Sequence, residues 1–175
     1  MLATLTILIL SNKNVSYFIS ISRPDNIVVY YGSSTNNVVY EKDSEEYLSI
    51  YTSITKCHNQ KSLDSFLRGN LSKKPKIVEQ NDCRLDFNNL LISFAYYAPQ
   101  PVKLNDKTYS YNGYGYWYKN LVFIISDTNW NYNSVAIIPP SDSNHYVSAY
   151  NYNLYYQTYS NYSLEYNNLY KFAKS

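Results

Sequence analysis

The chain has 175 residues and a formal net charge of +2, from 15 basic and 13 acidic side chains. This length is typical of one domain, and the charge balance excludes a dedicated nucleic-acid-binding protein, which would carry a clearly basic stripe. Hydrophobic residues make up 45% of the chain and charged residues 16%, which favours a folded domain over a disordered one. Tyrosine occupies 23 positions, against four for glycine.

Residues 1–10 form the most apolar stretch of the chain. They are too few to span a bilayer alone, but they match the length of a signal-peptide core. One interpretation makes residues 1–22 a signal or anchor segment ahead of a single domain at 23–175, although no basic residues precede the apolar stretch. The other places strands at residues 5–10 and 16–21 in a hairpin belonging to the core of a cytosolic protein. We favour export.

Residues 27–41 predict a β-hairpin, because two runs of β-branched and aromatic residues flank the turn-forming residues 32–37. A helix is expected next, at about residues 44–57. Asp43 or Ser44 can cap its first turn, and Tyr47, Ile50 and Ile54 recur at helical spacing. A second, short helix is expected at 62–68, followed by a loop that holds a brief edge strand at 77–78.

The rest of the chain predicts strands at residues 90–97, 121–125, 134–138 and 145–156, and a helix at about 163–174. Asn112 and Gly113 form the commonest two-residue hairpin turn, between tyrosine-rich flanks. Because runs of strands are segregated from the helices, the expected fold class is α+β with a mostly antiparallel sheet.

The sequence contains no catalytic constellation that we can identify. There is no Gly-x-Ser-x-Gly elbow and no glycine-rich phosphate loop. Cys57 and His58 are adjacent, and adjacent residues on a helix do not face each other. With His145 far away in sequence, no metal-ligand spacing exists either. We therefore expect neither catalysis, nor a cofactor, nor a metal.

Cys57 and Cys83 are the only cysteines. A single disulfide between them is plausible outside the cytoplasm, where it would close a loop of about 26 residues and contribute on the order of 3 kcal/mol. The alternative is a pair of separate free thiols. The spacing alone does not decide between the two.

Aromatic residues give the strongest local signal. In an extended segment, Tyr114, Tyr116 and Tyr118 share one face and Trp117 lies on the other. Such rows suit the binding of sugars, peptides or proteins, but compositional bias together with packing on a half-buried sheet is the interpretation that we favour. The candidate ligand contacts are Tyr109, Tyr111, Tyr114, Tyr116, Trp117, Tyr118 and Trp130.

Several segments together resemble a known class of domain. They are Ile-Val-Val-Tyr-Tyr from residue 27, Glu-Glu-Tyr-Leu-Ser-Ile-Tyr from 45, Leu-Leu-Ile-Ser-Phe-Ala-Tyr-Tyr from 90, Pro-Gln-Pro-Val-Lys-Leu-Asn from 99, Tyr-Lys-Asn-Leu-Val-Phe-Ile from 118, and the closing Leu-Tyr-Lys-Phe helix. In order and spacing, residues 27–175 are similar to small membrane-anchored or exported extracytoplasmic domains of low-GC Gram-positive bacteria. The resemblance rests on hydrophobic pattern and implies a location at the cell envelope, but it assigns no site residues. The chain departs from the expected export signal in lacking a basic start and a lipobox cysteine.

The expected function is therefore a non-catalytic extracytoplasmic domain that acts by binding or assembly. Its partner would be a protein or glycan of the cell envelope, with no role for nucleic acid and with membrane contact through residues 1–22. One alternative is a carbohydrate-binding module or carbohydrate-active enzyme that uses the aromatic hairpin. Another is a cytosolic domain with residues 1–22 in its core.

Overall fold

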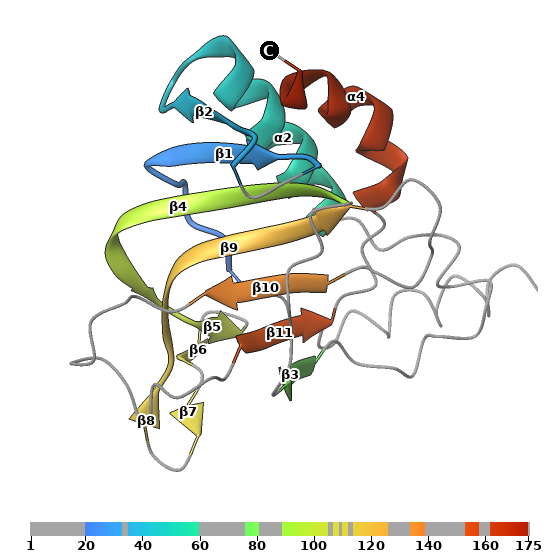
Figure 1. Ribbon diagram of the computed structural model, residues 1–175. Helices are drawn as coiled ribbons and strands as arrows, with labels where there is room; N and C mark the ends of the chain where they lie inside the picture. The colour runs from blue at the N-terminus through green and yellow to red at the C-terminus, as the bar shows by residue number, and fades with distance from the viewer. Residues whose placement is uncertain are drawn as a thin grey trace, which may run out of the picture.

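The computed structural model describes residues 20–32, 35–59, 76–80, 89–104, 107–108, 110–111, 114–125, 134–138, 153–157 and 162–174. It consists of one large antiparallel sheet with helices at one end (Figure 1). The predicted α+β class is confirmed.

Seven strands form the large sheet, in the order β2-β1-β4-β9-β10-β11-β3, and every neighbouring pair is antiparallel. The strands are β1 (Asn26–Tyr30), β2 (Asn37–Glu41), β3 (Lys76–Gln80), β4 (Leu90–Pro101), β9 (Trp117–Ile125), β10 (Ser134–Ile138) and β11 (Asn153–Gln157). The expected edge strand at 77–78 is β3, which pairs with β11 at one edge. The predicted hairpin at 27–41 is β1–β2 at the other edge.

The two longest strands form the middle of the sheet. β4 runs on through Pro99 to Pro101, beyond the predicted end at residue 97, because its pairing with β9 shifts between Ala95 and Gln100 and then resumes. Such an irregularity bends a strand and accommodates prolines that cannot donate a ladder hydrogen bond. The bend carries β4 toward two small hairpins.

Side chains alternate between two buried faces of this sheet, as the two-residue period of a strand requires. In β9, Leu121, Phe123 and Ile125 face the main core, which also contains the helices, whereas Val122 and Ile124 belong to a second cluster on the opposite face. Strands β4 and β10 show the same alternation. Both faces are therefore apolar in the middle of the sheet, which accounts for the unbroken hydrophobic runs in the sequence.

Helix α2 (Glu45–Asn59) packs on the main-core face. Its first turn is capped as predicted, since the backbone N–H of Tyr47 donates to Ser44 Oγ at 3.2 Å. Tyr47, Ile50 and Ile54 are fully buried along one side of the helix. The periodic pattern in the sequence therefore identified the buried side correctly.

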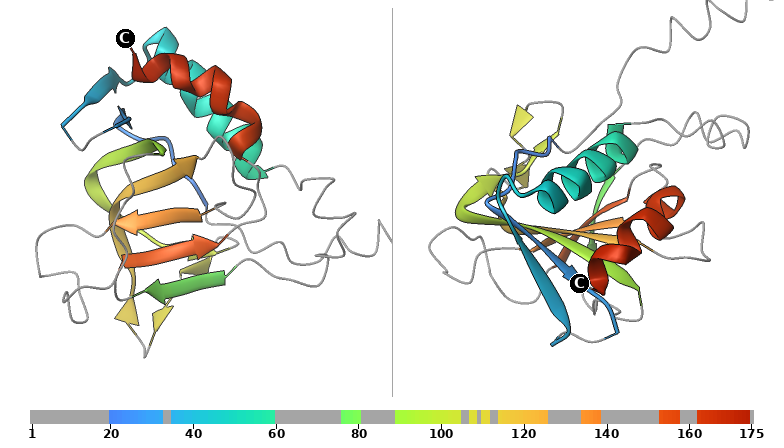
Figure 2. Two further views of the ribbon diagram at one scale, coloured as in Figure 1. Left: turned by 45° about the vertical axis from the view of Figure 1, so that its right-hand side comes forward. Right: turned by 90° about the horizontal axis from the view of Figure 1, so that it is seen from above.

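The chain closes with a continuous helical stretch made of η3 (Tyr162–Glu165), α4 (Tyr166–Tyr170) and η4 (Lys171–Ala173). This confirms the predicted C-terminal helix at about 163–174. Figure 2 shows this stretch and α2 on the same side of the sheet, near β1 and β2. The side chains of Leu169 and Phe172, on the inner side of this stretch, are buried.

Two small ladders lie at the opposite end of the molecule from the C-terminus (Figure 1). β5 (Lys103–Leu104) pairs with β6 (Lys107–Thr108), and β7 (Ser110–Tyr111) pairs with β8 (Tyr114–Gly115). Tyr111 is opposite Tyr114, so the two residues between them make the connection that the Asn-Gly pair predicted.

Some expectations fall outside the described residues: the N-terminal hairpin, the helix at 62–68 and most of the predicted strand at 145–156, of which β11 covers the end. Within the ranges described, no helix combines the length and apolar character needed to cross a membrane.

Candidate functional site

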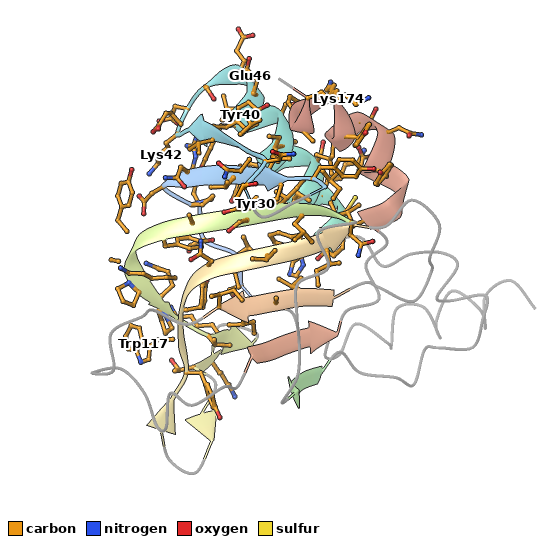
Figure 3. The ribbon with its side chains drawn as sticks, in the orientation of Figure 1. Tyr30, Tyr40, Lys42, Glu46, Trp117 and Lys174 are labelled. Atoms are coloured by element: carbon orange, nitrogen blue, oxygen red, sulfur yellow. The ribbon has the colours of Figure 1, made fainter. Side chains whose placement is uncertain are left out.

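The structure separates the predicted aromatic contacts into different environments. Tyr118 is a core residue with 1% of its surface exposed, and Tyr116 is half-buried against the same core. Trp117 is half-buried (Figure 3), and the two-residue period of a strand places it on the other side of β9 from Tyr118. For Tyr111 and Tyr114 the structure gives the pairing of their backbones in β7 and β8. Tyr109 and Trp130 lie outside the described residues. The expected division of Tyr116 and Tyr118 from Trp117 is present, with the tyrosine face turned inward.

Trp117 belongs to a small surface that we call the hairpin end, made of residues 101, 103, 107–108 and 115–117. Trp117 is opposite Pro101 in the register of β9 with β4. A Cβ at Gly115 would lie 3.7 Å from Trp117 Nε1 and 3.8 Å from Thr108 Cγ2, so these groups adjoin. Thr108 is in turn paired with Lys103, which is exposed. An indole and a lysine therefore lie at the same end of the sheet.

The segment that leads into the domain, residues 20–25, is held to the core although it is in neither helix nor strand. Its backbone donates two hydrogen bonds to strands, from Ser20 N to Lys103 O in β5 at 3.1 Å and from Asp25 N to Ala95 O in β4 at 2.9 Å. We call these six residues the lead-in segment. They are the first residues of the chain that the structure describes.

Two tyrosine hydroxyls donate to the lead-in segment from the core. Tyr47 Oη donates to the carbonyl of Pro24 at 2.6 Å, and Tyr96 Oη donates to that of Ser22 at 2.8 Å. Both rings are buried. Burial raises the pKa of each hydroxyl above its ordinary value, which keeps both groups protonated as donors. Each bond gives a hydrogen-bond partner to a backbone carbonyl that takes part in no strand pairing.

Arg23 adds charge to this attachment. Its guanidinium forms an ion pair with Asp43 and lies 5.6 Å from the centre of the Tyr47 ring. Asp25 accepts from the backbone N–H of Tyr97 at 2.7 Å. The ion pair is exposed and contributes little free energy by itself.

A second buried polar contact joins α2 to the closing helical stretch. His58 Nδ1 and Tyr162 Oη lie 2.7 Å apart, and the two rings are nearly parallel. The Phe123 ring packs edge-on against both of them. His58 and Tyr162 are 2% and 1% exposed, so no substrate can reach them in this arrangement. Their contact links α2 to the closing helix across 104 positions of sequence.

Cys57 lies beside this pair and is a buried free thiol. Burial, and then the charge of Glu165, raises the pKa of the thiol to about 11. At neutral pH it is therefore protonated and unsuited to nucleophilic attack, which requires the thiolate. Cys83 lies outside the described residues, so the disulfide between the two stays a prediction.

The closing helix is held by tyrosines as well. Tyr40 Oη donates to the carbonyl of Phe172 at 2.7 Å, and the Tyr31 ring meets the Tyr170 ring edge-on at 4.8 Å. The helical spacing in the sequence marked Tyr47 as a packing residue, but no pattern assigned a partner to Tyr40 or Tyr96. Only their position in β-type runs hinted at burial.

The described residues offer no converging group of three His, Cys, Asp or Glu side chains that could hold a metal ion. Comparisons with profiles of protein families, with curated proteins and with solved structures found no significant match to this chain.

Proposed function

We propose that this chain is a non-catalytic extracytoplasmic domain, kept at the cell envelope by its apolar N-terminal segment, that acts by binding or assembly with another envelope component. The observation that carries the proposal is the lead-in segment. An apolar stretch at residues 1–10 is followed, ten residues later, by a segment whose carbonyls accept from buried Tyr47 and Tyr96.

This arrangement suits a tethered domain. A domain held by one end must transmit any pull on its tether to the sheet without unravelling. The contacts of Ser20 and Asp25 with β4 and β5 place that load on backbone hydrogen bonds near the bend of the longest strand. A flexible linker would need no such attachment.

The compartment can be tested with a fusion of alkaline phosphatase to the C-terminus, since this enzyme is active only after export. The full chain is expected to give an active fusion in the membrane fraction, and a chain lacking residues 1–19 an inactive one in the cytosol. An inactive full-length fusion, with the native protein in the cytosolic fraction, would refute the proposal.

A glycan-binding module is the second candidate, favoured by two aromatic rings that retain surface. Tyr97 is 71% exposed and Trp117 is half-buried. Aromatic rings of this kind stack on sugar faces. A glycan array would test it: binding that is lost in Trp117→Ala but kept in Tyr31→Phe supports it, and an array without hits removes it.

A cytosolic domain with residues 1–22 in its core is the third candidate. Its support is Ile21, which is half-buried against the main core. Because Ser22 and Ile21 contact the domain, the deletion that tests this candidate must end at residue 19. Loss of folding without residues 1–19 would favour the core hairpin over the tether.

A further inference from the structure

We propose that the hairpin end is the surface by which the domain rests on a membrane, with Lys103 and Lys107 on anionic lipid headgroups and Trp117 in the interfacial layer. The inference rests on the proposed function, because it takes residues 1–10 as the membrane-inserted segment. It adds an orientation and a lipid chemistry that the proposed function leaves open.

The short link between the apolar stretch and the domain places the hairpin end near the membrane. Ser20 donates its backbone N–H to the carbonyl of Lys103, so the chain enters the domain at the hairpin end. The stretch from Leu10 to Ser20 spans at most about 35 Å when fully extended. The described residue nearest in sequence to the apolar stretch is therefore in contact with Lys103. When the intervening residues are not fully extended, the charge of Lys103 can come within a Debye length of the headgroups.

The distribution of charge favours the same orientation. Residues 101–119 include Lys103, Lys107 and Lys119 against one acidic residue, a net charge of +2. Residues 41–46 carry four acidic side chains against Lys42, a net charge of −3. Figure 3 shows Lys42 and Glu46 at the end of the molecule away from Trp117. Lys171 and Lys174 are exposed at that same end and offset two of its three negative charges, so an anionic surface attracts the hairpin end more strongly than the other end.

The chemistry of the exposed side chains agrees with this orientation. Lys103 and Lys107 are exposed on opposite faces of the β5–β6 ladder, so both can reach a surface that meets the ladder end-on. Trp117 is half-buried beside Thr108. Tryptophan and lysine are the residues that proteins place at membrane–water interfaces, since an indole is apolar with one polar group and a lysine stem is flexible.

The test compares binding of the full chain to two kinds of vesicle, phosphatidylcholine alone and phosphatidylcholine with 30% phosphatidylglycerol. Three proteins are used: the wild type, K103Q/K107Q, and K171Q/K174Q as a control with the same charge change. Lys171 and Lys174 are exposed at the other end, with their ammonium groups over Phe172 and Tyr170.

On the anionic vesicles, K103Q/K107Q is expected to bind at least tenfold more weakly than the wild type, from about fivefold for each lysine near the surface. The control is expected to change binding by less than twofold, and all three proteins to bind equally to phosphatidylcholine. Equal binding of K103Q/K107Q and wild type, or an equal loss in the control, would overturn the inference while leaving the tether intact.

The two proposals fail in different ways. If the wild type binds only the anionic vesicles, and K103Q/K107Q loses that binding, the hairpin end is still the lipid-binding surface, but residues 1–10 do not act as a membrane tether. Absence of binding to either vesicle overturns both. A Trp130→Phe background leaves Trp117 as the one tryptophan, and brominated lipid should quench its fluorescence. Unquenched emission from bound protein would contradict the proposed orientation.

Discussion

The main core and the hairpin end are both built with aromatic residues, and they use them differently. In the core, Tyr47 and Tyr162 are buried and each hydroxyl has a partner within 2.7 Å. At the hairpin end, Tyr116 and Trp117 are only half-buried. A high tyrosine count therefore does not by itself mark a recognition surface. A buried tyrosine can also use its hydroxyl to donate a hydrogen bond to a segment that lies in neither helix nor strand.

The largest effect is expected at a buried aromatic ring that contacts three others. Phe123 contacts Phe94 at 4.8 Å between ring centres and also packs against His58 and Tyr162. Phe123→Ala should lower the free energy of unfolding by about 3–5 kcal/mol, because it removes a large ring and leaves a cavity. Urea denaturation measures this. Tyr97→Ala, at an exposed ring, is the control and should cost less than about 0.5 kcal/mol.

A smaller effect is expected from the polar pair between the helices. His58→Leu and Tyr162→Phe should each destabilise the fold by about 1–3 kcal/mol, because each leaves a buried partner without this hydrogen bond. The double variant should cost less than the two added together. A double-mutant cycle measures the coupling, and strictly additive effects would show that the contact contributes nothing of its own.

The raised pKa of Cys57 predicts a loss of stability in alkali. Between about pH 9, where an unfolded thiol ionises, and the folded pKa of about 11, the unfolded chain releases a proton that the folded one retains. The free energy of unfolding therefore falls as the pH rises through this window. Cys57→Ala should be less stable at pH 7 but show a shallower decline. An unchanged slope would mean that the thiol ionises equally in both states.

The smallest effect is expected from the N-terminal segment. Removing residues 1–19 should change the free energy of unfolding by less than about 0.5 kcal/mol, because the contacts of the lead-in segment remain. Removing residues 1–25 should destabilise the domain by several times that amount, since it deletes the acceptors of Tyr47 and Tyr96. Equal stability of the two truncated chains, measured by thermal unfolding, would contradict the importance of this segment.

Local sequence patterns predicted most of the elements but not their partners. The cap at Ser44 and the buried side of α2 followed from residues within two turns of each other. The pairing of β3 with β11, and of His58 with Tyr162, joins positions far apart in sequence, for which no local signal exists. The period of two placed Tyr116 and Tyr118 on one face correctly. It could not say that this face is the inner one, because tyrosine is stable on either side of a sheet.

Buried tyrosine hydroxyls hold the lead-in segment to the core, and one pair of variants tests this attachment most directly. Tyr47→Phe removes a single oxygen from the bond to Pro24, whereas Tyr97→Phe removes one from a ring that is 71% exposed. Urea denaturation at pH 7 should show a loss of about 1–2 kcal/mol for the first and less than about 0.3 kcal/mol for the second. Equal stability of the two variants would contradict the claim.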